Sequence, residues 1–273
     1  MTKLEREPGL RERKQARTKL ALLDAFVEAL GERSLEAIAV RDLCATVPVS
    51  EATFFNYFRG KADLVTYFVQ LWSLDHAWHA RRTLEREGAL AAIGEIFART
   101  AETVREHPRV LAEVIAAQAR LEGPPEVHEI GLAERRERFA ELDGIEELPA
   151  RGLDSLLPWL LDEAIARGEL RPDAPRDLLF LTLAAVFFGT PVALLRGSPA
   201  AVGDAWRAQL ALLLGPHRVT SAAAPTATKA TATKATTTKA AATKATATNA
   251  ESRTKPRKTS RSDKARKTPE KKR

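Results

Sequence analysis

Apolar residues recur at helical spacing through most of the chain, up to about residue 218. In the segment 12–31, Leu22, Phe26 and Leu30 stand four residues apart and form one apolar stripe. Patterns of this kind, separated by prolines and glycines, continue along the chain, and alternating strand-like segments are scarce. The sequence therefore predicts an all-α fold, with further helices at about 40–46, 50–57, 61–82, 89–106, 109–122, 128–142, 153–166, 176–196 and 200–214.

The end of the chain follows another pattern. Residues 225–249 repeat with a period of five (PTATK, ATATK, ATTTK, AAATK, ATATN), which fits neither a helix nor a strand. Ala, Thr and Lys cannot bury enough apolar area to offset the entropy lost on ordering. We therefore predict that residues 219–273 form a disordered, basic, Lys/Ala/Thr-rich tail.

Charge is divided between these two parts. The formal net charge is +7, but residues 220–273 hold 15 Lys and Arg against three acidic residues, so the body is mildly acidic. The single cysteine, Cys44, excludes an internal disulfide, and the first twenty residues contain no apolar run. These features indicate a soluble protein of a reducing cytoplasm.

One long apolar segment allows two interpretations. Residues 178–195 carry no charge, which meets the lower length limit of a transmembrane helix. A helix buried on most sides, for example in a subunit interface, gives the same pattern. We favour the interface and expect no membrane insertion.

The most informative segment is residues 40–64. Two short predicted helices, 40–46 and 50–57, are joined by a tight turn at 47–49, which is typical of a helix-turn-helix. Ser50 is a suitable N-cap for the second helix. Four apolar residues are expected to face inward and fix the angle between the helices, namely Leu43, Val49, Phe54 and Phe58. Six residues are left to face outward: Ser50, Glu51, Ala52, Thr53, Asn56 and Tyr57.

This segment resembles the DNA-binding domain of the tetracycline-repressor (TetR) family of bacterial transcription regulators. The family pattern is roughly V-x-D-I-A-x-x-A-G-V-S-x-x-T-[LF]-Y-x-[HY]-F-x-x-K-x-x-L. It is matched here by Val40, Asp42, Leu43, Val49, Ser50, Thr53, Phe54, Tyr57, Phe58, Lys61 and Leu64. The resemblance covers about the first 65 residues. It implies a three-helix DNA-binding domain at 1–60 and a helical effector-binding and dimerisation domain at 61–218.

Three positions depart from the family pattern. Pro48 replaces the turn glycine, and its ring is expected to exclude a left-handed conformation. Ala39 stands where the family often has a capping threonine, and Phe55 replaces a tyrosine whose hydroxyl commonly touches the DNA backbone.

The resemblance also implies roles for individual residues. Tyr57 and Lys61 correspond to phosphate contacts, and Thr53 to a backbone or base-edge contact. Glu51 and Ala52 take positions that often approach base edges, where Glu51 could accept from cytosine and Ala52 could touch a thymine methyl. Glu51 could instead merely complement the helix N-terminus. Arg41, in the first of the two short predicted helices, is a candidate groove or phosphate contact.

The remaining helices would sense an effector and form a dimer. The family's last two helices pair with those of a second subunit, a role that suits 176–196 and 200–214. Four aromatic residues could line an apolar effector pocket, although such residues more often belong to a plain core. These candidates are Trp72, Phe97, Trp159 and Phe187.

Other chemistry is weakly supported. Asp75, His76 and His79 could contribute to a metal site, but no cysteine or third histidine lies nearby. Phosphate-binding glycine motifs and a nucleophile elbow are absent from the sequence. We therefore expect no metal, no cofactor and no enzymatic activity.

These observations predict a homodimeric transcription regulator that binds double-stranded DNA, most simply a repressor released by a small apolar effector. The alternative is an architectural DNA-binding protein dominated by its tail, which resembles the basic tails of linker-histone-like nucleoid proteins. A flexible polycation binds duplex DNA through counterion release without a folded surface. On either interpretation, the protein is expected in the cytoplasm, at the nucleoid.

Overall fold

The structure is a computed structural model that describes residues 7–120, 129–149, 152–194 and 197–219. The predicted disordered tail, apart from Val219, lies outside these residues, and so do His128 and residues 195–196.

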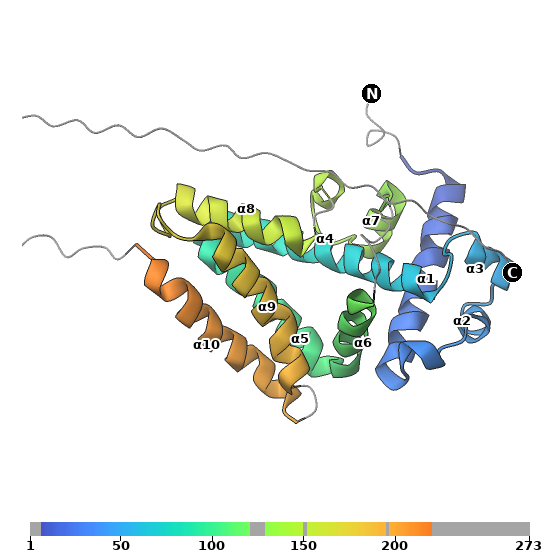
Figure 1. Cartoon of the computed structure of the whole chain (residues 1–273). Helices are drawn as coiled ribbons and strands as arrows, with labels where there is room; N and C mark the ends of the chain where they lie inside the picture. The colour runs from blue at the N-terminus through green and yellow to red at the C-terminus, as the bar shows by residue number, and fades with distance from the viewer. Residues whose placement is uncertain (1–6, 121–128, 150–151, 195–196, 220–273) are drawn as a thin grey trace, which may run out of the picture. The chain divides into compact units, whose positions relative to one another are not determined.

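The described residues are almost all helical (Figure 1). Within them, the extended pairing is limited to one isolated bridge between Leu170 and Arg218. The predicted all-α fold is confirmed. The α-helices are α1 (Leu10–Glu32), α2 (Val40–Thr46), α3 (Glu51–Phe55), α4 (Lys61–Glu87), α5 (Ala89–Glu106), α6 (Pro108–Ala119), α7 (Leu132–Arg138), α8 (Leu153–Ala166), α9 (Arg176–Leu194) and α10 (Val202–Leu214). The 3-10 turns are η1 (Leu35–Ala37), η2 (Ile145–Glu147), η3 (Pro199–Ala201) and η4 (Gly215–His217).

The helix α7 differs most from its prediction. A helix was expected over 128–142, but α7 ends at Arg138 because Phe139 leaves helical geometry, with φ −129° and ψ 41°. The chain then turns back, so that Ile145 and Leu148 are buried. The guanidinium of Arg135 holds this turn by donating to the carbonyls of Ile145, Glu146 and Leu148 at 2.6 to 3.3 Å.

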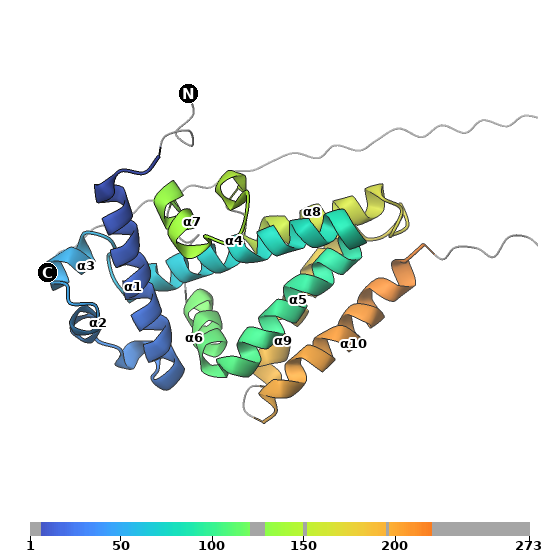
Figure 2. The same cartoon turned by 180° about the vertical axis from the view of Figure 1, so that it is seen from behind.

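Buried apolar side chains form two clusters. The first joins α1, α2, α3 and the first half of α4 to α6 and the segment around η2, and Phe26, Phe54 and Tyr67 are among its largest members. The second packs the rest of α4 against α5, α8, α9 and α10, around Phe187 and Trp206. These helices lie at the end of the fold away from α2 and α3 in both views (Figures 1 and 2).

The long helix α4 belongs to both clusters. It contributes Leu64 to Leu74 to the first and Ala77 to Leu84 to the second. The core therefore does not divide at the predicted domain boundary after residue 60. A displacement of α4 would be felt in both clusters.

Candidate nucleic-acid interface and internal cavity

The helices α2 and α3 form a helix-turn-helix held by an apolar side. Leu43, Phe54 and Phe58 are at most 2% exposed, as predicted, whereas Val49 is only half-buried. The rings of Phe54 and Phe58 lie 5.7 Å apart, and Phe58 in turn packs on Tyr67 of α4 at 5.5 Å. The pair is thereby fixed to the long helix.

The predicted N-cap of α3 is present. The Ser50 hydroxyl accepts a hydrogen bond from the Thr53 backbone N–H at 3.1 Å, and its oxygen lies 2.9 Å from the Thr53 hydroxyl. A cap of this kind stabilises a short helix by about 1 kcal/mol. Thr53 is half-buried and its hydroxyl is already engaged with the cap.

The opposite side of α2 and α3 is largely open to solvent. Arg41, Glu51, Ala52 and Asn56 are exposed, as is Ser50, while Tyr57 is half-buried against the apolar cluster. The Arg41 guanidinium lies 3.5 Å from Asp42, with its side chain 78% exposed. These residues are therefore accessible to a ligand as large as duplex DNA; their contact with DNA stays a prediction.

Lys61 is placed differently from its predicted phosphate-contacting position. Its ammonium donates to three backbone carbonyls, those of Leu35 at 2.6 Å, Ile38 at 2.7 Å and Glu36 at 3.2 Å. An ammonium has three donors, so this set uses all of them. In this structure Lys61 holds the turn η1 ahead of α2 instead of projecting to solvent.

The expectation that Pro48 excludes a left-handed turn is wrong. Its φ is 24°, far from the value of about −65° that the ring prefers. The Val49 N–H still bonds to the Cys44 carbonyl at 3.0 Å, which closes the end of α2 as in a Schellman motif. The second bond of that motif is missing because proline has no N–H.

The other two departures from the family pattern appear as expected. Ala39 precedes α2 without a side-chain cap hydrogen bond. Phe55 is 53% exposed and meets Phe54 edge-on at 5.3 Å, without a hydroxyl to offer.

Residues 22–67 match the family model described as bacterial regulatory proteins, tetR family. The N-terminal domain belongs to the TetR family. The matched residues include α2, α3 and the start of α4, so this part of the chain is a helix-turn-helix DNA-binding domain of the TetR type.

Solved structures share this fold well beyond the matched domain. One is Thermus thermophilus FadR, a TetR family transcriptional repressor in complex with lauroyl-CoA, at 20% identity over 76% of this chain and 98% of that one, with a TM-score of 0.53. Another is a protein of unknown function from Rhodococcus sp. RHA1, at 17% identity over 74% of this chain and 96% of that one, with a TM-score of 0.50. No curated protein matches the chain.

Behind this TetR-type domain lies a cavity of about 660 Å³. Its walls come from α4, α5, α6, the start of α8 and α9. The volume falls in the range of small-molecule sites. Of the four predicted pocket residues, Trp72 and Phe187 line it.

Phe97 and Trp159 do not line this cavity, which corrects the sequence-based prediction. Phe97 is buried between Phe187 and Trp206, at 5.2 and 5.4 Å. Trp159 packs on the same cluster from α8.

The polar lining of the cavity was not predicted from the sequence. Thr66, Gln70 and Ser73 recur at i, i+4 and i+7, which places them on one side of α4.

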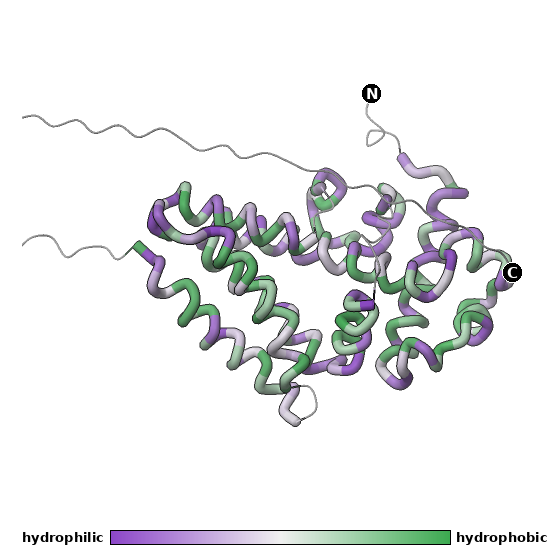
Figure 3. Tube along the Cα trace, in the orientation of Figure 1, coloured by the Kyte–Doolittle hydropathy of each residue, from purple (hydrophilic) through white to green (hydrophobic). Residues whose placement is uncertain are grey.

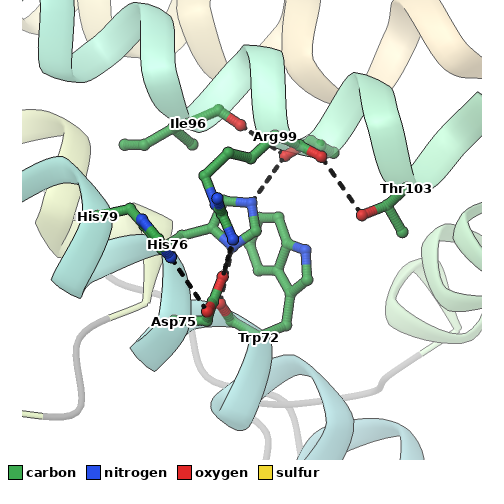
Figure 4. Close-up of polar contacts among 8 residues, drawn as sticks. Trp72, Asp75, His76, His79, Ile96, Arg99 and Thr103 are labelled. Atoms are coloured by element: carbon green, nitrogen blue, oxygen red, sulfur yellow. Dashed lines mark hydrogen bonds and ion pairs between the residues drawn. The ribbon is translucent and has the colours of Figure 1, made fainter. Parts of the chain in front are cut away.

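A buried histidine supports the cavity wall from behind (Figure 4). The His76 ring stacks on Trp72 at 3.8 Å, its Nδ1 lies 2.9 Å from the Trp72 carbonyl, and its Nε2 lies 3.2 Å from the Thr100 hydroxyl. Burial lowers the pKa of His76 to about 4, although the Trp72 carbonyl and Asp75 favour the charged form. The ring is therefore neutral at physiological pH, with Nδ1–H as the donor.

The neighbouring carboxylate is engaged with other residues. Asp75 accepts from Arg99 at 3.1 Å and lies 3.6 Å from His79. Burial alone would raise the pKa of Asp75, but the hydrogen bond from His79 and the charge of Arg99 lower it below its usual value. Among the described residues, no group of three His, Cys, Asp or Glu side chains is arranged to hold a metal ion.

A second polar cluster joins the DNA-binding domain to α7. Glu134 accepts from Lys19 of α1 at 2.5 Å and from the Tyr67 hydroxyl of α4 at 2.6 Å. Two further pairs, Arg17 with Glu137 and Arg138 with Asp24, run along the same two helices at 2.9 and 2.7 Å. Burial and the charge of Glu134 raise the pKa of Tyr67, so the phenol stays protonated and donates.

The helices α9 and α10 leave apolar side chains in solvent. Leu178, Leu181, Val192 and Leu212 are more than half exposed, and hydrophobic residues run along much of α9 (Figure 3). By length and composition α9 could cross a membrane, but a single such helix among the described residues is weak evidence. Only 28% of its apolar window is buried inside this chain.

Proposed function

We propose that this chain is a homodimeric, sequence-specific transcription repressor that a small-molecule effector releases from DNA. The observation that carries the proposal is the course of α4. At its first residue, Lys61 holds the turn before α2, and about three turns later Trp72 lines the cavity. One long helix thus joins the helix-turn-helix to a ligand-sized cavity.

This arrangement supports release by an effector. A ligand shifts a conformational equilibrium only by its differential affinity for the two states. A molecule that fills the cavity contacts α4 at residues 66–73, and Tyr67 in that stretch is tied to Lys19 of α1 through Glu134. Its binding would favour an α4 position in which the two DNA-binding domains of a dimer no longer match successive major grooves.

The exposed apolar residues of α9 and α10 support the dimer. A second copy packed on Leu178, Leu181, Val192 and Leu212 would remove these side chains from water. A two-fold interface brings two identical DNA-binding domains to one side of the assembly, which suits a pseudo-palindromic operator. We place this dimer in the cytoplasm, at the nucleoid.

Selection from random duplex DNA with the full chain tests the proposal. The expected product is a two-fold symmetric site with half-sites about one helical turn apart. On that site, Arg41→Ala should weaken binding and lower the slope of log K against log salt by about 0.9, the value for one lost phosphate contact. The matched control is Arg86→Ala, which removes the same charge from the exposed far end of α4 and should leave affinity unchanged. A symmetric site bound equally well by Arg41→Ala would contradict DNA reading through α2 and α3.

A second function is favoured by the lysines that recur every five residues between 225 and 249. An architectural protein that binds through such a polycation needs no operator. The same selection would then enrich no sequence, and footprinting would show uniform protection of the DNA.

A further inference from the structure

The described lining of the cavity lacks positive charge. None of these residues is a lysine, arginine or histidine, and the one charged side chain is Asp154, which is exposed at the rim. The guanidinium of Arg99 lies on α5 nearby, but it does not line the cavity and donates to Asp75. A buried carboxylate or phosphate would therefore lose its hydration without gaining a charged partner among the described lining residues, which disfavours its binding.

One hydroxyl inside the cavity is left without a partner. Ser73 is 5% exposed and lines the cavity, and within the described residues its hydroxyl makes no hydrogen bond. Other lining hydroxyls donate within their own helices, Thr100 to the Ile96 carbonyl at 2.7 Å and Thr103 to the Arg99 carbonyl at 3.3 Å. A hydroxyl that lines a cavity and makes no hydrogen bond within its own helix is available to donate to, or accept from, a bound molecule.

The rest of the lining is apolar or neutral. Trp72, Phe180, Phe187 and Phe188 supply aromatic surface, and the Trp72 ring is held in place by its stack on His76. The remaining polar groups include the amides of Gln70 and Gln118, which carry no charge. Such a wall takes an apolar body and orients it through a few polar contacts.

We propose that this cavity takes an uncharged, mainly apolar molecule that carries a hydroxyl or carbonyl group, and that Ser73 bonds to that group. This inference rests on the proposed effector site and names its ligand class. The proposed ligand class differs from the lauroyl-CoA that the structure of Thermus thermophilus FadR holds. Shared fold at 20% identity does not carry over a ligand, and the described lining offers no positive charge to pair with phosphates.

Three ligands with the same ten-carbon chain isolate the effect of charge. The full chain is titrated at neutral pH with 1-decanol, decanoate and decylammonium, with heat of binding and rise in melting temperature as readouts. Decanol should bind at least tenfold more tightly than decanoate and more tightly than decylammonium. Decanoate binding as tightly as decanol would overturn the inference while leaving an effector site in place. No binding of any of the three would also overturn it, whereas the operator selection described above would be unaffected.

Variants of Ser73 test the polar contact. Ser73→Ala should weaken decanol binding about threefold to tenfold, the range for one buried neutral hydrogen bond. Ser73→Thr keeps a hydroxyl and should recover part of that loss. The control is Ser155→Ala, which removes an exposed hydroxyl at the rim of the same cavity and should leave decanol affinity unchanged. Equal decanol affinity in wild type and Ser73→Ala would show that the Ser73 hydroxyl does not bond to the ligand.

Discussion

Replacement of His76 should make the protein less sensitive to mild acid. The ring is 3% exposed and its pKa is about 4, against an ordinary value of 6.5 that applies when the chain is unfolded. Between these values the unfolded chain binds the proton and the folded chain does not, so stability rises with pH through this window. The contribution is complete above about pH 6.5 and is lost as the pH falls toward 4.

The size of the effect follows from the same two values. Each pKa unit of difference between the folded and unfolded states is worth about 1.4 kcal/mol. Integration of the proton linkage from about pH 7.5 to about pH 5 gives a loss of about 2 kcal/mol in the free energy of unfolding from His76 alone. Carboxylates with lowered pKa values, such as Asp75, lose their contribution at lower pH and add little over this range.

Urea unfolding of the wild type and His76→Asn at these two pH values measures the effect. Asparagine keeps a donor for the Trp72 carbonyl but does not titrate. Between the two pH values, the free energy of unfolding of His76→Asn should therefore fall by about 2 kcal/mol less than that of the wild type. The control is His79→Asn, which changes a more exposed histidine beside the same carboxylate and should retain most of the wild-type loss. Equal losses in the wild type and His76→Asn would refute the buried neutral ring.

Three further substitutions test local features by chemical denaturation. Pro48→Gly should stabilise the fold by about 1 kcal/mol, because it relieves a φ of 24° and restores a donor at the end of α2; a loss of stability would show that the turn does not need the positive φ. Ala39→Ser should add about 1 kcal/mol by capping α2, and no gain would mean that the Ala39 position does not act as an N-cap. Glu134→Gln should cost about 2 kcal/mol or more because it removes the charge that pairs with the half-buried Lys19; unchanged stability would contradict the bridge between α1 and α7.

Much of the fold could be predicted from local sequence signals. Periodicity and helix-ending residues gave α2, α5 and α8 their observed bounds, since Pro108 and Gly168 stand near the ends of helices whose apolar faces are regular. The observed burial of Phe54 and Phe58 also follows from spacing alone.

Two basic side chains have roles that sequence spacing did not indicate. Lys61, predicted to contact phosphate, and Arg135, for which no role was predicted, each donate to backbone carbonyls of a 3-10 turn. These turns leave carbonyls without helical partners, and a long basic side chain reaches them across the fold. Which cation reaches which carbonyl depends on tertiary packing, so sequence spacing does not reveal it.

For a similar reason, only two of the four predicted aromatic residues line the cavity. Trp72, Phe97, Trp159 and Phe187 are equivalent as aromatic residues on predicted helices, and only the rotation of each helix decides which face the space. The polar residues Thr66, Gln70 and Ser73 were the better signal, because their spacing places them together on one side of α4.

The central claim is that DNA is held by the exposed side of α2 and α3. Footprinting the selected operator with the full chain and with Arg41→Ala combined with Tyr57→Phe tests it most directly, because both changes leave the buried side of the pair intact. We expect a short, two-fold symmetric footprint for the wild type that disappears in the double variant while its melting temperature is unchanged. A discrete footprint of undiminished strength in the double variant would contradict DNA binding through α2 and α3.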